Sequence, residues 1–369
     1  MPRGIIRAPP ANLPELVRAA FARARGDGDL HYFPTQVTVL PVGIVPFQLR
    51  FSPALANKPA NKAPSPSTGS SSSSPSRHQP PDPFADPPRA LFVADVGPAH
   101  YLVLNKFAVV PEHFILATRA FEHQTDVLAE GDLEAALACV RAYDDCDGDG
   151  EQLFVFFNCG EHSGASQPHR HLQLLPVRRM RDGLLVEGRE KAEEGAVDMR
   201  RADGSGSTWS VLADDADLLT GVPFATFSED IHLGMSATDL FAAYLRLYRR
   251  ACRAVAAHNN DGDAGEEGDE GRQAPAAATG RARISYNMAM TRSRLVICPR
   301  LAEGDAVRKG GEEKPVGRLA LNGTVLAGTA LVKTQAEWDA LREDPGQLAS
   351  VLERIGVPRR GGEAAGAML

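Results

Sequence analysis

The chain has 369 residues, of which 43% are hydrophobic and 24% charged, and its formal net charge is −7. A length and composition of this kind are typical of a soluble globular protein with one large or two ordinary domains. A molecule with this charge does not attract nucleic acid as a whole, so we expect no nucleic-acid partner. Any polyanionic ligand must be held by a local site.

A helix is expected at residues 13–25, with Pro14 in its first turn and Gly26 beyond its end. Strand character follows at residues 31–51, broken by Pro41 and Pro46, and then at 90–94 and 100–110. Next come a helix at residues 132–142, an apolar strand at 153–158 and an alternating strand at 169–175. The clearest helix covers residues 236–257, and further strands are expected at 285–290, 294–298, 318–321 and 329–333. Strand blocks interrupted by single helices, without regular βαβ alternation, predict an α+β fold with a mainly antiparallel sheet and flanking helices.

Several stretches have the composition of insertions into this unit. Residues 61–88 are rich in Ser and Pro and are expected to be disordered, as is an acidic loop at 258–280. Residues 179–220 are interpreted as a surface insertion and 346–369 as a C-terminal tail. Residues 1–60 with 89–178 would then form the N-terminal part of one catalytic domain, and residues 221–345 its C-terminal part.

Features that the sequence lacks indicate the cellular compartment of the protein. No run approaches the roughly 18 apolar residues that a membrane-spanning helix needs, and the start of the chain has no apolar signal segment. The five cysteines include no C-x-x-C pair, which favours reduced thiols over a zinc ribbon or disulfide framework. We therefore expect the cytoplasm, with the nucleus as a second compartment, and no membrane partner.

The most informative pattern is the run His169-Arg170-His171-Leu172-Gln173. Side chains alternate along a strand, so the two histidines and Gln173 share one face. A neutral imidazole is a good nucleophile near pH 7. Two other interpretations stay open for the residues alone: an H-x-H metal site, although no third ligand lies at suitable spacing, and histidines that simply hydrogen-bond in the core.

Directly upstream lies a loop of small and hydroxylated residues. Gly160, Ser163, Gly164, Ala165 and Ser166 allow backbone N–H groups to converge on a phosphate. The amides of Asn158 and Gln167 add neutral donors. Together with the histidines, this loop predicts a phosphate held beside a nucleophile.

The run from Ser163 to Gln173 closely resembles the fungal-type diadenosine tetraphosphate phosphorylases, also called ATP adenylyltransferases, a transferase branch of the histidine-triad superfamily. Blocks at residues 46–59, 104–126 and 285–328 resemble the same family in the same order. The resemblance implies a histidine-triad-like fold and a nucleophile at His171, with His169 as its positioning neighbour. His171 would attack the α-phosphorus of the dinucleotide, release ATP and form an adenylyl-histidine. Inorganic phosphate would then attack to give ADP, reversibly.

The third place of the motif separates the branches of this superfamily. Hydrolases have histidine there, whereas this chain has Gln173. An amide is no general acid, but it can donate to an α-phosphate oxygen, which favours transfer to phosphate over hydrolysis. A nucleotidyltransferase with another donor, such as a nucleotide sugar or adenosine phosphosulfate, remains an alternative, as does a non-catalytic sensor of dinucleoside polyphosphates.

The substrate carries several negative charges, and three cations in motif blocks are candidates to bind them: Lys58, Lys106 and Arg292. Asn105 is a candidate for the ribose or base, and Asn322 is a weaker one, since each also suits a structural role. No dedicated metal site is expected, and Mg²⁺ would be carried by the substrate. The partners expected are dinucleoside polyphosphate, ATP, ADP and phosphate, and the family comparison favours a monomer.

Overall fold

The computed structural model describes residues 9–57, 82–145, 151–184, 209–261, 278–309 and 314–359. Its centre is an eight-stranded sheet with the order β10-β12-β11-β8-β9-β7-β5-β4, in which every neighbouring pair is antiparallel. The strands are β4 (Phe92–Val96), β5 (His100–Leu104), β7 (Phe114–Thr118), β8 (Leu153–Cys159), β9 (His171–Pro176), β10 (Phe227–Asp230), β11 (Ser285–Met290) and β12 (Arg294–Arg300). The α+β class with a mainly antiparallel sheet is confirmed.

The sheet joins the two halves of the chain. Strands β4, β5, β7, β8 and β9 precede residue 180, whereas β10, β11 and β12 follow residue 220. The junction is the pair β8–β11, where Asn158 lies opposite Asn287. A side chain at the end of β8 can therefore contact groups from both halves.

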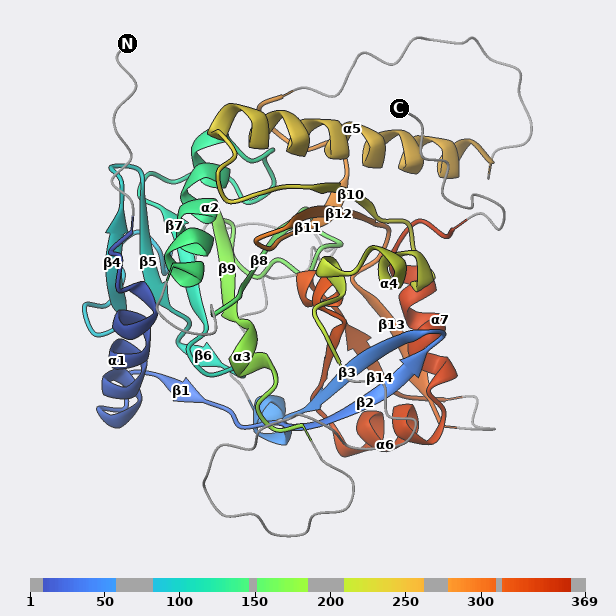
Figure 1. Cartoon of the computed structure of the whole chain (residues 1–369). Coiled ribbons are helices and arrows are strands. Elements are labelled where there is room, and N and C mark those ends of the chain that lie inside the picture. The colour runs from blue at the N-terminus through green and yellow to red at the C-terminus, as the bar shows by residue number, and fades with distance from the viewer. Residues whose placement is uncertain are drawn as a thin grey trace, which may run out of the picture.

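Three helices cover one face of the sheet: α1 (Leu13–Gly26), α2 (Glu130–Asp144) and α5 (Ala237–Asp261) (Figure 1). Their apolar side chains pack on Val155, Phe157 and Leu172 in a first core. Each expected helix is present, and its apolar residues recur at helical spacing, so one stripe faces the sheet.

The opposite face carries a second core around Phe154, Phe156 and Leu175. A small sheet of order β15-β3-β2 packs there, with the hairpin β13–β14 and helices α6 and α7 beside it (Figure 1). These elements are β2 (Gln36–Val42), β3 (Val45–Phe51), β13 (Gly304–Arg308), β14 (Pro315–Ala320), β15 (Thr329–Val332), α6 (Gln335–Glu343) and α7 (Gly346–Ile355). The remaining ones are β1 (His31–Tyr32), β6 (Phe107–Ala108), α3 (Val177–Met180), α4 (Ala216–Gly221) and the 3-10 turns η1 (Pro53–Asn57), η2 (Leu212–Asp214) and η3 (Gly323–Ala327).

Two prolines do not break the N-terminal strands as expected. Pro41 and Pro46 lie opposite each other beside the β2–β3 turn, where Gly43 adopts a φ of 58°. Strand β2 lies at the edge of its sheet, and β15 pairs with β3 only from Gln48 onward. The N–H groups that the two prolines lack are therefore not needed for pairing.

The expected insertions and tail are smaller than their composition suggested. Leu348, Val351 and Leu352 of α7 are buried in the second core, so residues 346–355 belong to the fold and are not a tail. Trp209 and Leu212 are buried in the same core, and Phe84 is buried in the first, which removes residues 209–220 and 82–88 from the expected insertions. Apolar side chains spaced among polar ones are enough to anchor each segment. Residues 179–184, 258–261, 278–280 and 356–359 are also described, with Met180 buried in the second core and residues 258–261 at the end of α5. Residues 61–81, 185–208, 262–277 and 360–369 lie outside the described residues.

Among the described helices, none is both long and apolar enough to cross a membrane.

Candidate functional site

His171, the first residue of β9, is 3% exposed. Its Nδ1 lies 2.8 Å from the carbonyl oxygen of His169. A carbonyl only accepts, so Nδ1 carries the hydrogen and Nε2 keeps its lone pair. Burial, partly offset by the hydrogen bond to His169, lowers the pKa of His171 from 6.5 to about 4. The ring is therefore neutral near pH 7 and has a free nitrogen that can attack phosphorus.

His169 is fixed from both sides. Its Nδ1 lies 2.7 Å from Oδ2 of Asp82, and its Nε2 lies 2.8 Å from the carbonyl oxygen of Thr118. Each ring nitrogen therefore faces an oxygen that can accept a hydrogen bond. Both ring nitrogens of His169 are thus engaged by protein groups, 1% of its surface is exposed, and its carbonyl oxygen supports the His171 ring.

The segment that brings Asp82 also covers the two histidines. The ring of Phe84 lies 4.9 Å from that of His171 and 5.7 Å from that of His169, measured between centroids. Both histidines therefore project to the same side of the sheet, as the alternation predicted. Phe84 itself is held by Tyr101, whose hydroxyl donates to its carbonyl oxygen at 2.6 Å.

Gln124 connects strands β8 and β9 by hydrogen bonds beside the motif. Its Oε1 accepts from the backbone N–H of His171 at 2.8 Å, and its Nε2 donates to the carbonyl oxygen of Asn158 at 2.7 Å. Strands β8 and β9 pair only up to Gln173, so these hydrogen bonds replace the missing strand pairing at the end of β9 where His171 lies.

The glycine-serine loop adopts the unusual backbone that its composition predicted. Gly160 and Gly164 have φ values of 87° and 78°. A Cβ atom at Gly164 would come within 2.8 Å of the Leu321 carbonyl oxygen, so a larger residue cannot fit. Ser163 is buried and its hydroxyl donates to the Gly160 carbonyl oxygen at 2.6 Å. The side chains of Ala165 and Ser166 are exposed and that of Gln167 is half-buried, so these three border the open side of the loop.

Asn158 has a different position from the one expected for a phosphate donor. Its Oδ1 accepts from Nδ2 of Asn287 at 2.9 Å and from the backbone N–H of Gly323 at 2.8 Å. Asn287 also accepts from Arg300 and donates to the Ser163 carbonyl oxygen. The Asn158 side chain thus ties the loop to the C-terminal half of the chain, and in the described structure its oxygen faces protein.

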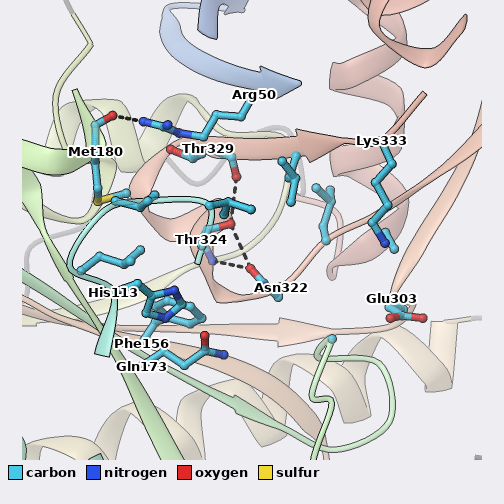
Figure 2. Close-up of a pocket in the computed structure, with 17 residues that line it drawn as sticks. Arg50, His113, Phe156, Gln173, Met180, Glu303, Asn322, Thr324, Thr329 and Lys333 are labelled. Carbon is cyan, nitrogen blue, oxygen red and sulfur yellow. Dashed lines mark hydrogen bonds between the residues drawn. The ribbon is translucent and has the colours of Figure 1, made fainter. Parts of the chain in front are cut away.

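Gln173 marks the edge of a cavity of about 230 Å³ between β9 and the small sheet (Figure 2). The polar and charged side chains that line it are Arg50, His113, Gln173, Glu303, Asn322, Thr324, Thr329 and Lys333. Gly164 lines it too, so the cavity begins where the phosphate loop and the third motif position meet. Its other walls are apolar, with Phe156, Leu175 and Met180 among them.

His113 occupies the wall beside Gln173. The amide of Asn105 is oriented by Phe107, whose N–H donates to Oδ1 at 2.9 Å, so Nδ2 is the atom 3.2 Å from Nδ1 of His113. Asn105 is therefore a support for His113. Burial lowers the pKa of His113 from 6.5 to about 4, against a smaller opposite effect of Gln173.

The expected cations are not brought together. Lys58 lies outside the described residues. Lys106 is exposed, with its Nζ 6.0 Å from the centre of the Phe107 ring. Arg292 lies in the β11–β12 turn, at the opposite end of β11 from the loop, where it forms an exposed ion pair with Asp144 at 3.2 Å. Arg170 faces away from the site, as expected, and pairs with buried Asp132 at 3.1 Å.

Asn322 lines the cavity but its Oδ1 caps the following turn by accepting from the N–H and hydroxyl of Thr324 at 3.0 and 2.9 Å. The structure also adds residues that the sequence argument did not select: Asp82, His113, Thr118, Gln124 and Arg50. Most of them contact the motif although they are 40 or more positions away in the sequence. Asp82 lies in a segment whose composition predicted disorder. Four of these, Arg50, His113, Thr118 and Gln124, had a signal because they stand in blocks that resemble the family, whereas Asp82 lies outside those blocks.

Among the described residues, no group of three or more His, Cys, Asp or Glu side chains is placed to hold a metal ion. The His169–His171 pair instead makes the bonds given above to a carboxylate and two carbonyls.

Comparison with known proteins agrees with this arrangement. Residues 4–186 match the family model of the Ap4A phosphorylase N-terminal domain, and residues 220–358 match that of the ATP adenylyltransferase C-terminal domain. The chain belongs to the Ap4A phosphorylase/ATP adenylyltransferase family. The recognition made from the motif blocks is confirmed, and the protein is an enzyme of this family.

Individual family members match either nearly the whole chain or about half of it. Diadenosine 5′,5‴-P1,P4-tetraphosphate phosphorylase 2 of Saccharomyces cerevisiae is 28% identical over 366 residues, which span 95% of this chain and 97% of that protein. Protein APA1 of the same yeast is 33% identical over 179 residues, 46% of this chain and 50% of its own length. The crystal structure of yeast Ap4A phosphorylase Apa2 superimposes with a TM-score of 0.65 at 26% identity and covers 97% of this chain and 100% of that one. A structure of Apa2 in complex with AMP has the same fold, with a TM-score of 0.63 at 23% identity, covering 98% of this chain and 100% of that one.

Proposed function

We propose that this enzyme catalyses the reversible phosphorolysis of diadenosine tetraphosphate by inorganic phosphate to ADP and ATP, through an adenylyl-histidine at His171. The 28% identical yeast relative is named as a phosphorylase of this dinucleotide, which supports the choice of substrate. The observation that carries the mechanism is the hydrogen bond from Nδ1 of His171 to the His169 carbonyl oxygen. It leaves Nε2 as the only ring nitrogen with a lone pair, and that atom is the nucleophile.

The first step forms a bond between Nε2 and the α-phosphorus and breaks the bond from that phosphorus to the bridging oxygen of the leaving ATP. In the adduct the positive charge of the ring is shared with the Nδ1–H, whose carbonyl partner stabilises it. In the second step an oxygen of inorganic phosphate takes the α-phosphorus, the bond to Nε2 breaks, and ADP leaves.

The absence of an acid at position 173 is compatible with this chemistry. A phosphate anion is a good leaving group that needs no proton, so an amide that donates to a non-bridging oxygen is sufficient. Water is a poorer nucleophile than phosphate and gains nothing from Gln173, because an amide cannot act as a general base. Gln173 therefore supports transfer to phosphate over hydrolysis.

The test is to incubate the full chain with diadenosine tetraphosphate labelled in the α-phosphate, without inorganic phosphate. An adduct that is acid-labile and base-stable is expected on the wild type and not on His171→Ala, and added phosphate should convert it to ADP. His258→Ala, at the exposed end of α5, is the matched control and should behave as wild type. An adduct that persists in His171→Ala would refute the assignment, and tight binding without adduct or turnover would indicate a sensor.

A further inference from the structure

The turn before β7 contains a residue in an unusual backbone conformation. Glu112 has a φ of 60°, and no other non-glycine residue within the described ranges has a positive φ. A residue with a Cβ atom is strained in this left-handed region, which favours glycine. Such strain persists only where surrounding contacts hold it, and it is concentrated at functional sites. The next residue along the chain is His113, which lies on the cavity wall beside Gln173.

The Glu112 side chain is buried among arginines. Only 3% of it is exposed, and its Oε1 accepts from Nε and Nη2 of Arg179 at 3.0 and 2.5 Å. Nη2 of Arg178 lies 3.6 Å from Oε2, and Nε of Arg18 lies 4.0 Å from Oε1. The hydrogen bonds to Glu112 raise the pKa of Arg179 above its ordinary value. A carboxylate buried to this extent is destabilised without its cations, so the ion pair and the position of Glu112 depend on each other.

This ion pair joins the ends of two neighbouring strands. Glu112 lies two residues before β7, and Arg179 lies in α3, directly after β9. Where these strands pair, Ile115 lies opposite Gln173. His113 is two residues before Ile115, so its side chain projects to the same face as that of Gln173. The Glu112–Arg179 pair therefore connects the strand ends beside which His113 and Gln173 lie.

The direction of the His113 ring depends on this turn. Asn105 donates to Nδ1 of the ring at 3.2 Å and to the backbone carbonyl oxygen of His113 at 2.9 Å. The other ring nitrogen, Nε2, is buried and has no hydrogen-bond partner in the described part of the chain. Burial lowers the pKa of His113, and Gln173 lies close enough to oppose that effect. One side-chain hydrogen bond and the backbone of the turn therefore hold the ring beside Gln173.

We propose that Glu112 is a positioning residue for the reaction: its ion pair with Arg179 holds the left-handed turn that directs His113 towards Gln173. Glu112 does not line the cavity itself and acts through His113. The proposal rests on the proposed function, in which the Gln173 amide donates to an α-phosphate oxygen. A turn that relaxed to a negative φ would move His113 away from the amide. The amide would then be less well oriented for the charge that develops in the transition state.

The test compares three replacements of Glu112 in the full chain. Glu112→Ala removes the carboxylate and leaves a Cβ atom that resists the left-handed conformation, so adduct formation at saturating dinucleotide should slow about tenfold or more. Glu112→Gly adopts that conformation without strain, and Glu112→Gln still accepts from Arg179, so both should recover part of the rate. The KM should change much less than the rate in all three. Glu151→Ala, the matched control, removes an acid that pairs with Arg18 and Arg178 in the same cluster and should keep the wild-type rate.

The imidazole ¹⁵N signals of His113 provide a second measurement, which requires no reaction. They are assigned by their loss in His113→Gln. The signals should shift in Glu112→Ala, shift less in Glu112→Gly and keep their wild-type positions in Glu151→Ala. If Glu112→Ala does not fold, Arg179→Gln removes the same ion pair at a side chain that is 29% exposed. It should shift the signals and slow adduct formation in the same direction.

Two results would overturn the proposal. The first is a wild-type rate and wild-type His113 signals in Glu112→Ala or Arg179→Gln with only a lower melting temperature, because the ion pair would then stabilise the fold alone. The second is an equal loss of rate in Glu112→Gly and Glu112→Ala, because the left-handed turn would then play no part. Failure of the phosphorylase assignment is distinguishable: the wild type would form no adduct, while the His113 signals would still respond to Glu112→Ala.

Discussion

Oδ2 of Asp82 lies 2.7 Å from Nδ1 of His169, whose carbonyl oxygen in turn accepts the hydrogen that fixes the tautomer of His171. The Asp82 carboxylate thus influences His171 through the orientation of His169. Asp82 is 87 positions from His169, and the same carboxyl group also accepts from the N–H of Phe84 at 2.9 Å. Asp82 therefore positions both the His169 side chain and the Phe84 ring that covers it.

Asp82→Asn should slow adduct formation about tenfold or more, because it replaces a charge-assisted hydrogen bond with a neutral one. Because Asp82 acts through His169, the KM for the dinucleotide should change much less than kcat. Asp82→Glu should recover part of the rate. Asp86→Asn, an exposed acid in the same segment, is the control. A loss of kcat/KM that comes entirely from a higher KM would argue against a positioning role for Asp82.

The pH dependence of the first step follows from the lowered pKa of His171. A histidine with an ordinary pKa of 6.5 loses half of its nucleophilic form at that pH, whereas His171, at about 4, stays neutral. The single-turnover rate of adduct formation should therefore remain flat from pH 8 to about pH 5.5, with any titration of the substrate measured separately. A fall in rate near pH 6.5 that persists with a substrate analogue of different phosphate pKa would contradict the lowered pKa of His171.

Stability should depend on pH through the same burial. His113 and His171 both have a pKa lowered from 6.5 to about 4. Between these values the unfolded chain binds more protons, so the stabilisation is complete above pH 6.5 and is lost as the pH falls towards 4. Each histidine contributes on the order of 3 kcal/mol to this change. Urea unfolding should show that the free energy of unfolding falls less between pH 7 and pH 4.5 in His113→Gln than in the wild type. His258→Gln should lose as much as the wild type. Equal losses in all three proteins would contradict the lowered pKa of His113.

The contact between the two halves of the chain can be tested at Asn158. Its Oδ1 accepts from Asn287 and from the N–H of Gly323, so Asn158→Ala leaves two buried donors without an acceptor. The free energy of unfolding should fall by about 2–4 kcal/mol. Asn259→Ala, on the exposed end of α5, should change it by less than about 0.5 kcal/mol. A loss of activity with normal stability would instead favour the phosphate contact that the sequence predicted for Asn158.

Local sequence patterns identified the strand and loop that carry the candidate site. They did not reveal contacts between residues that are far apart in the sequence. The alternation at residues 169–173 placed His171 and Gln173 correctly because strand geometry depends on neighbours in sequence. Asp82 was missed because its role depends on a partner 87 positions away and its surroundings have a disordered composition. Arg292 was selected from a family-like block, but a block does not reveal which end of β11 lies at the site. Arg50 was missed because its contact with Met180, 130 positions away, forms only when distant segments pack together.

Gln173→His tests the residue on which the transferase interpretation depends. A histidine there would supply an acid and base beside the adduct, so water should compete better with phosphate. At fixed phosphate, the AMP fraction of the products should rise about tenfold or more relative to ADP. Gln173→Asn, which keeps the amide but shortens its reach, should lower the overall rate without raising the AMP fraction. The measurement is the AMP to ADP ratio across a phosphate series. If Gln173→His gives the wild-type ratio at every phosphate concentration, the preference for phosphate does not reside in the third position of the motif.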